Sequence, residues 1–259
     1  MAKIISIVNQ KGGVGKSTTC VNLAAALGKG KSKVLVVDLD PQGNSTSGLG
    51  VDKSSPVTIY EVLIEGQEAA QAVVKTPYGD VIPSNKVLSG AEIELVNLED
   101  REHRLQRMLR PIAEKYDYVL IDCPPSLGML TINALCASDS LLVPVQCEYY
   151  ALEGLSQLMS TVRQVKRLYN PYIELEGVLL TMFDGRLNLT LQVVEEVKKY
   201  FPQKVFKTVI PRNVRLSEAP SFGQPVQYYD GSSRGARAYD ELADELLHNN
   251  RMKTPGRKG

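Results

Sequence analysis

The stretch of sequence that decides the fold is Asn9-Gln10-Lys11-Gly12-Gly13-Val14-Gly15-Lys16-Ser17-Thr18. It follows a short β-branched run, Ile4–Val8, and it opens a segment with helical periodicity, Ser17–Leu27. Glycines between a strand and a helix let successive backbone N–H groups point toward one centre, where the helix N-terminus adds the positive end of its dipole. The stretch therefore predicts a loop that binds phosphate groups.

Two side chains of this loop suit nucleotide chemistry. We expect the Lys16 ammonium to reach the β- and γ-phosphates of ATP and the Ser17 hydroxyl to ligate Mg²⁺. The usual pattern G-x-x-x-x-G-K-[ST] fails at its first position, where Gln10 replaces glycine, and a second lysine, Lys11, stands inside the loop. A glycine-rich turn that only caps a helix is the alternative. The nucleotide-binding residues predicted here are Lys11, Gly12, Gly13, Val14, Gly15, Lys16, Ser17 and Thr18.

Short apolar runs alternate with longer helical patterns along the rest of the chain. This alternation is typical of a parallel sheet wrapped by helices, and continuous apolar runs suit strands buried on both faces. We predict a single-domain, doubly wound α/β fold of the P-loop NTPase type over residues 1–250, with a mostly parallel sheet, and a disordered basic tail over 251–259. The expected strands are Ile4–Val8, Val34–Val37, Tyr118–Ile121, Ser140–Val145, Val178–Met182 and a weaker Val209–Ile210; the expected helices are Ser17–Leu27, Arg101–Glu114, Leu152–Leu168, Leu191–Tyr200 and Ala236–His248; Gly43–Ser89 is expected to be irregular.

Composition excludes several classes of protein. With 43% hydrophobic and 23% charged residues, the chain is globular rather than disordered. Its 30 Lys and Arg against 29 Asp and Glu exclude a protein that is basic throughout, so any nucleic acid would be bound by a local patch. Four cysteines without a C-x-x-C pair argue against a disulfide framework or a zinc site. No apolar run approaches the ~20 residues of a membrane span and no signal peptide is evident, which predicts a cytoplasmic protein.

Carboxylates stand at the ends of two predicted strands. Asp38 and Asp40 follow Val34–Val37, and Asp122 follows Tyr118–Ile121. In open α/β sheets, ligands bind at the carboxyl ends of the strands. Asp122 is therefore placed to hold Mg²⁺ directly or through water, as a Walker B carboxylate does.

The loop K-G-G-x-G-K-[ST], with its early lysine, resembles the deviant Walker A motif of the ParA/MinD superfamily of ATPases. Two further stretches, Val145–Leu155 and Arg212–Ser221, are similar to the chromosome-partitioning ParA group called Soj, and the resemblance runs from Lys3 to about Leu247. It implies an ATPase whose ATP-bound homodimer binds double-stranded DNA without sequence preference. It also implies release from DNA when a ParB-type centromere-binding protein stimulates hydrolysis, and a nucleoid-associated location.

The resemblance also implies roles for individual residues. Lys11 would contact the nucleotide of the partner subunit, and Asp40 would orient the attacking water. The backbone at Pro211 and the amide of Asn213 would read the adenine base. The catalytic set is then Lys11, Lys16 and Asp40, and the residues for Mg²⁺ are Ser17, Asp122 and Asp38, the last also supporting the loop.

Basic residues outnumber acidic ones from Arg186 onward. The resemblance aligns Arg186 and Arg215 with DNA-contacting arginines. Charge clusters are more often solvated faces, which is the alternative here. Because no recognition-helix pattern is present, contact with phosphates rather than bases is expected. The candidate DNA-binding residues are Arg186, Arg215, Lys198, Lys199 and Arg234.

Rival functions share the same loop. A MinD-like positioning ATPase needs a membrane-targeting C-terminus, whereas Ala236–His248 has the pattern of a packed terminal helix, so no membrane partner is expected. An iron-protein-like electron carrier needs cluster-binding cysteines, and Cys123 and Cys147 lack flanking glycines. A tyrosine kinase would carry a C-terminal tyrosine cluster, and a metabolic ligase would show a substrate-pocket signature. Since the loop begins near residue 11, we expect no N-terminal DNA-binding extension.

Overall fold

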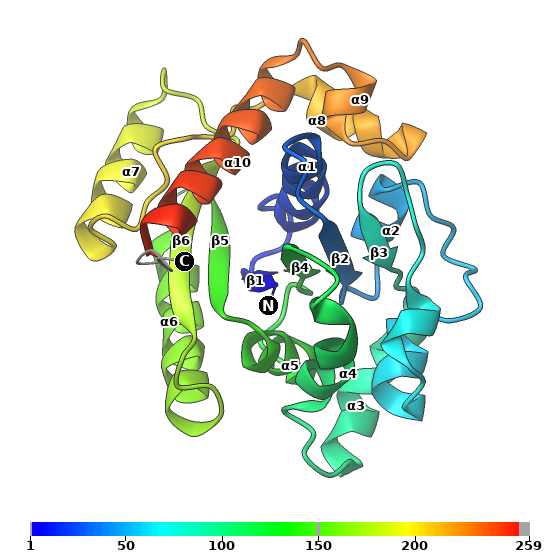
Figure 1. Ribbon diagram of the computed structural model, residues 1–259. Helices are drawn as coiled ribbons and strands as arrows, with labels where there is room; N and C mark the ends of the chain where they lie inside the picture. The colour runs from blue at the N-terminus through cyan, green and yellow to red at the C-terminus, as the bar shows by residue number, and fades with distance from the viewer. Residues whose placement is uncertain (1, 149–150, 254–259) are drawn as a thin grey trace, which may run out of the picture.

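A parallel sheet of six strands runs through the centre of the molecule in the order β3-β2-β4-β1-β5-β6 (Figure 1). The computed structural model describes residues 2–148 and 151–253. β1 pairs with β4 on one side and β5 on the other, and every neighbouring pair is parallel. The carboxyl ends of all six strands therefore meet at one edge of the sheet. The strands are β1 Lys3–Ile7, β2 Val34–Asp38, β3 Asp80–Ile82, β4 Tyr118–Asp122, β5 Ser140–Gln146 and β6 Glu174–Thr181.

Successive strand residues pack into two apolar layers, one on each face of the sheet. Along β4, Val119 packs into one layer and Leu120 into the other, and along β2 Leu35 and Val36 divide in the same way. Side chains of a strand alternate between its faces, so continuous apolar runs require cover on both sides. The predicted doubly wound parallel sheet is confirmed.

Helices supply that cover. α1 and α10 pack on one face, while α4, α5 and α6 pack on the other; Figure 1 shows α1, α8, α9 and α10 above the sheet and α3, α4 and α5 below it. The helices are α1 Lys16–Lys29, α2 Asn44–Gly48, α3 Ala91–Glu94, α4 Arg104–Ala113, α5 Met129–Ala137, α6 Ala151–Leu168, α7 Asn188–Tyr200, α8 Val214–Glu218, α9 Val226–Tyr229 and α10 Arg234–Lys253. Shorter turns are η1 Glu61–Glu65, η2 Ala69–Ala72, η3 Lys86–Gly90, η4 Leu95–Asn97 and η5 Ala219–Phe222.

Apart from the short helices and turns, none of which was predicted, the structure departs from the sequence prediction in three elements. The prediction of a strand at Val209–Ile210 is wrong. This segment runs beside β6, but it is joined to β6 by isolated bridges and separate hydrogen bonds rather than by a continuous ladder of β-sheet hydrogen bonds. β3 lies inside the stretch expected to be irregular, and its three residues are too few to show a period. α5 was not predicted because its residues are buried almost all round and carry no amphipathic pattern.

Three further predictions concern the C-terminal tail, membrane-spanning segments and the cysteines. α10 continues through Lys253, three residues into the segment predicted as a tail, and residues 254–259 lie outside the described part of the chain. None of the described helices combines the length and apolar character needed to cross a membrane. All four cysteines are buried free thiols.

Candidate nucleotide-binding site

A cavity of about 410 Å³ lies at the carboxyl edge of the sheet, and we call it the carboxyl-edge cavity. Its floor is the glycine-rich loop at the start of α1. Its walls come from the segment that joins β2 to α2, from the end of β6 and from η5. Among the residues predicted from sequence, those that line it are Gly12, Gly13, Gly15, Lys16, Ser17, Thr18 and Asp40; the further lining residues are Val21, Asn22, Gln42, Asn44, Ser47, Gly48, Pro125, Met182, Ala219, Pro220 and Gln224.

The loop is held from three directions. Gly15 has φ 90°, a left-handed conformation that glycine adopts without strain, and α1 begins at the next residue. Asn9 accepts a hydrogen bond from the Lys11 N–H at 3.0 Å and donates one to the Pro144 carbonyl at 2.8 Å. The Thr181 hydroxyl donates to the Val14 carbonyl at 2.8 Å. The ends of β5 and β6 therefore brace the loop on which phosphates would lie.

Lys16 lies at the floor of the cavity with only 6% of its surface exposed. Its ammonium donates a hydrogen bond to the Lys11 carbonyl at 3.1 Å. Burial lowers the pKa of Lys16, while the charges of Asp122 and Asp40 oppose the shift. Lys16 has no ion pair with another described residue, and a buried cation in this state favours a bound anion, which is the role predicted for this lysine.

Lys11 points elsewhere. Its ammonium pairs with the Glu148 carboxylate at 2.6 Å, and its side chain keeps 38% of its surface exposed. It does not line the cavity of its own chain. The two loop lysines are thus divided between an inward and an outward position. Sequence reasoning missed Glu148, although it stands inside the stretch Val145–Leu155 that carried the family resemblance.

Asp122 ends β4 and is fully buried. Its Oδ2 accepts a hydrogen bond from the Ser45 hydroxyl at 2.7 Å, and its Oδ1 has no hydrogen-bond partner among the described residues. Burial, followed by the charge of Asp38, raises the pKa of Asp122. An oxygen of this kind fits a cation or a coordinated water. Within the described residues, no group of three or more His, Cys, Asp or Glu could hold a metal ion.

Asp38 and Asp40 shape the segment between β2 and α2. The Asp38 Oδ2 accepts hydrogen bonds from the N–H and the hydroxyl of Thr46, both at 2.7 Å, and Oδ1 accepts one from the Asp40 N–H at 3.2 Å. Burial raises the pKa of Asp38. Asp38 therefore supports the loop, and its direct contact with Mg²⁺ stays a prediction. Asp40 lines the cavity and accepts a hydrogen bond from the Gln42 N–H at 2.9 Å.

The two residues expected to read adenine do not line the carboxyl-edge cavity. Pro211 forms an isolated bridge with Phe183, and the Asn213 side chain caps α8 by accepting from the Arg215 N–H at 2.9 Å. Their roles stay predictions. The far wall is instead formed by Met182 and the η5 segment, which sequence reasoning missed. Met182 has φ 49°, an uncommon conformation for a residue with a side chain, at the end of a predicted strand.

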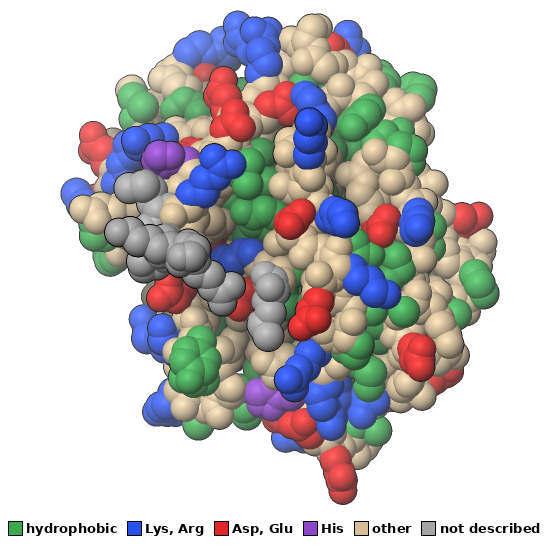
Figure 2. All heavy atoms as spheres, in the orientation of Figure 1, with side chains coloured by type: hydrophobic (Ala, Val, Ile, Leu, Met, Phe, Trp, Pro, Cys, Tyr) green, Lys and Arg blue, Asp and Glu red, His purple; other side chains and the backbone are tan. Residues whose placement is uncertain are grey.

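The candidate DNA-binding residues lie on or next to α7, α8 and α10. Most of them face carboxylates. Arg186 donates two side-chain hydrogen bonds and one backbone hydrogen bond to Asp184, and these lower the pKa of that carboxyl to about 2. Lys199 pairs with Glu196. On the face shown in Figure 2, Lys and Arg side chains are interspersed with Asp and Glu. The nucleotide-free chain thus presents no large basic field on that face.

Arg215 and the remaining two candidates differ in their surroundings. Arg215 pairs with Glu218 at 2.7 Å and with Asp230 at 3.2 Å. Lys198 and Arg234 are exposed and have no ion pair with another described residue. Three of the five candidate cations are therefore balanced within the chain. Contact with DNA phosphates would have to replace those carboxylates.

Comparison with known proteins identifies the family. A model of the AAA domain matches residues 2–175. The sporulation initiation inhibitor protein Soj of Bacillus subtilis is 58% identical over 252 residues, which cover 96% of this chain and all of that protein. The chromosome partitioning protein ParA of Myxococcus xanthus is 53% identical over 100% of this chain and 92% of its own length.

A solved structure shares the fold. It is named as cobyrinic acid a,c-diamide synthase from Mycobacterium smegmatis, with bound ADP and magnesium, and it matches with a TM-score of 0.86 and 38% identity over 98% of this chain and 97% of that one. Its identity to this chain is well below that of the partitioning proteins. The chain therefore belongs to the Soj/ParA family of chromosome-partitioning ATPases.

Proposed function

We propose that this ATPase binds ATP with Mg²⁺ in the carboxyl-edge cavity, dimerises over the nucleotide and holds DNA until hydrolysis separates the two subunits. The division between the two loop lysines carries the proposal. Lys16 is buried in its own cavity, whereas Lys11 is turned outward and partly exposed. A cation that cannot serve its own nucleotide is available to the nucleotide of a partner subunit.

Several residues of the cavity and of the adjoining strand ends have separate roles in hydrolysis. The loop N–H groups and Lys16 hold the β- and γ-phosphates, and Ser17 and Asp122 hold Mg²⁺. Bound Mg²⁺ supplies positive charge that offsets the charge of the phosphate oxygens. Asp40 orients the attacking water. Asp38 positions Asp40, because the Asp38 carboxylate accepts a hydrogen bond from the Asp40 N–H. Lys11 of the partner subunit then offsets charge that develops on the leaving phosphate.

DNA binding follows from dimerisation. Arg186, Arg215, Lys198, Lys199 and Arg234 contact phosphates of double-stranded DNA without reading bases. Each subunit contributes a modest patch whose cations are partly paired with carboxylates. Two copies fixed side by side double the number of phosphate contacts, and affinity rises steeply with that number. A ParB-type centromere-binding protein ends the DNA-bound state by stimulating hydrolysis.

DNA binding with ATP, with ADP and without nucleotide tests the proposal. Wild type should bind DNA only in the presence of ATP, and the affinity for DNA should fall steeply as the salt concentration rises. Arg215→Glu should dimerise with ATP but bind DNA about tenfold or more weakly. Arg110→Glu is the matched charge reversal on an exposed arginine of α4, and it should bind as wild type does. Equal DNA binding by the nucleotide-free protein would contradict the proposal.

A MinD-like positioning function is the second candidate. It would replace DNA by a membrane as the surface to which the ATP-bound dimer attaches. Sedimentation with anionic vesicles separates the two functions: vesicle binding that requires ATP, together with absence of DNA binding, would favour the second candidate.

A further inference from the structure

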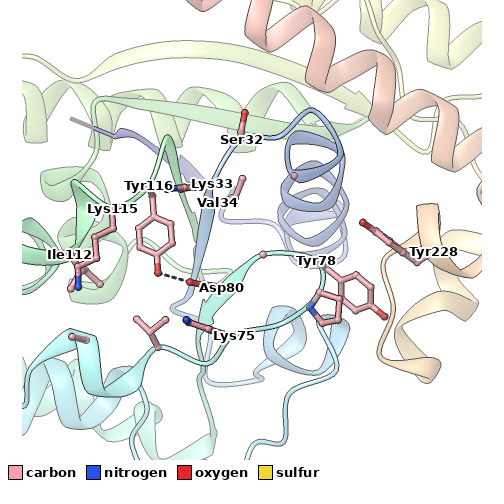
Figure 3. A pocket seen from close by; sticks show the side chains of 15 residues that line it. Ser32, Lys33, Val34, Lys75, Tyr78, Asp80, Ile112, Lys115, Tyr116 and Tyr228 are labelled. Atoms are coloured by element: carbon pink, nitrogen blue, oxygen red, sulfur yellow. Dashed lines mark hydrogen bonds between the residues drawn. The ribbon is translucent and has the colours of Figure 1, made fainter.

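A second cavity lies at the opposite edge of the sheet, where β2 and β3 begin, and we call it the amino-edge cavity (Figure 3). Its volume is about 560 Å³, larger than the carboxyl-edge cavity and within the roughly 300–1,000 Å³ of small-molecule sites. The end of α1, the segment that leads into β3, the end of α4 and α9 form its walls. The mechanism proposed above uses none of its residues.

Three lysines from three separate segments line this cavity. Lys33 precedes β2, Lys75 lies in the segment before β3, and Lys115 follows α4. None of their ammonium groups has an ion pair or a hydrogen bond to another residue of the described chain. Arg186, Arg215 and Lys199, in contrast, each have a carboxylate partner. Three lysines from separate segments therefore line one hollow without an ion-pair partner among the described residues.

One carboxylate faces the cavity, and it is already engaged. The Asp80 Oδ2 accepts a hydrogen bond from the Tyr116 hydroxyl at 2.7 Å, which Figure 3 shows as the dashed line. Burial, followed by the hydrogen bond to Asp80, raises the pKa of Tyr116, so this phenol stays protonated. The Asp117 carboxylate accepts a hydrogen bond from the Lys33 backbone N–H, but Asp117 lines a neighbouring hollow and not the amino-edge cavity. Three ammonium groups against one carboxylate leave a surplus of two positive charges.

Two tyrosines close the side of the cavity toward α9. The ring centroids of Tyr78 and Tyr228 lie 4.7 Å apart, and Figure 3 shows the pair between the turn before β3 and α9. A walled hollow of this size admits a small molecule. A DNA duplex instead contacts cations on open surfaces. The shape of the cavity therefore favours a small ligand, and its charge favours an anion.

We propose that the amino-edge cavity binds a small anion of the phosphate class with two or more negative charges, held by the ammonium groups of Lys33, Lys75 and Lys115. Lysine is a suitable ligand for such anions because its ammonium binds phosphate oxygens as a point charge. The site is separate from the nucleotide loop and does not depend on the proposed partitioning cycle.

Calorimetric titration with inorganic pyrophosphate tests the proposal. The full chain carries Lys16→Ala and is kept free of magnesium, so that the nucleotide loop contributes little. On that background, Lys75→Gln/Lys115→Gln should weaken pyrophosphate binding about tenfold or more. The matched control, Lys86→Gln/Lys207→Gln, removes two exposed lysines elsewhere and should leave the affinity unchanged.

Three results would overturn the proposal. They are absence of pyrophosphate binding by the Lys16→Ala chain, equal weakening in both double variants, and unchanged binding in Lys75→Gln/Lys115→Gln. If Lys75→Gln/Lys115→Gln made in the wild-type chain loses ATP-dependent DNA binding, while the same pair on the Lys16→Ala background keeps pyrophosphate binding, the lysines belong to the DNA surface instead. Circular dichroism on each variant establishes that the fold is retained.

Discussion

The two cavities of this molecule lie at opposite edges of one sheet and are built from opposite charges. The carboxyl-edge cavity is lined by Asp40 and the buried Lys16, and the fully buried Asp38 and Asp122 end the neighbouring strands β2 and β4. The amino-edge cavity gathers exposed lysines around a single hydrogen-bonded carboxylate. Buried charge costs far more free energy than exposed charge. This difference in burial indicates that the carboxyl-edge cavity needs ligands that neutralise its buried charges. The exposed lysines of the amino-edge cavity can stay without a ligand at little cost in free energy.

The largest expected effect is the loss of nucleotide binding in Lys16→Ala. This change removes the only ammonium among the residues that line the carboxyl-edge cavity, and we expect ATP affinity to fall about 100-fold or more. Titration with a fluorescent ATP analogue measures it. Lys115→Ala, in the amino-edge cavity, is the control and should bind ATP normally. Equal losses in both variants would mean that the two cavities are not independent.

A smaller effect is expected in the pH dependence of stability without nucleotide or Mg²⁺. Burial raises the pKa of Asp122 above its ordinary value, so the folded chain keeps a proton that the unfolded chain has already released. The free energy of unfolding should therefore fall as pH rises from the ordinary carboxyl pKa to about 7, by on the order of 1 kcal/mol per pH unit, and level off above that pH. Urea unfolding between pH 5 and pH 8 measures the slope.

Two variants locate the origin of this slope. Asp122→Asn should make the slope shallower, whatever its own effect on stability, and the remainder comes from Asp38, whose pKa burial also raises. Asp80→Asn in the amino-edge cavity should leave the slope as in wild type. Saturation with ADP and Mg²⁺ should also flatten it, because the bound ion keeps Asp122 ionised. A slope that is unchanged in Asp122→Asn would show that other groups cause it.

The smallest effect is expected from Glu148→Gln. The Lys11–Glu148 pair is partly exposed on both sides, and such pairs contribute about 0.2–1 kcal/mol. Freeing Lys11 should favour its contact with a partner's nucleotide, so the ATP-dependent dimer should form at a several-fold lower protein concentration. Analytical ultracentrifugation measures this shift, and Glu153→Gln, an exposed acid on α6, is the matched control. A weaker dimer in Glu148→Gln would assign the carboxylate to the dimer interface itself.

Local sequence patterns predicted much of the fold and part of the site. Five of the six strands and five longer helices were found within a few residues, because their apolar periods are set by neighbours in the chain. The glycine loop, Lys16 and Asp40 lie at the cavity as expected, since parallel strands bring their carboxyl ends to one edge. The Arg186–Asp184 pair was missed even though the two residues are two positions apart, so closer attention to local acids would have found it.

The sequence by itself determined the family, the phosphate loop and the carboxylates at the strand ends, because each is written in contiguous residues whose spacing has one structural meaning. Only the tertiary structure decided which lysine of the loop faces the cavity. Lys11 turns outward to Glu148, 137 positions away. The amino-edge cavity likewise exists only after folding, because its three lysines share no motif and meet through the packing of separate segments. Such contacts depend on long-range packing, which leaves no period in the chain for sequence analysis to detect.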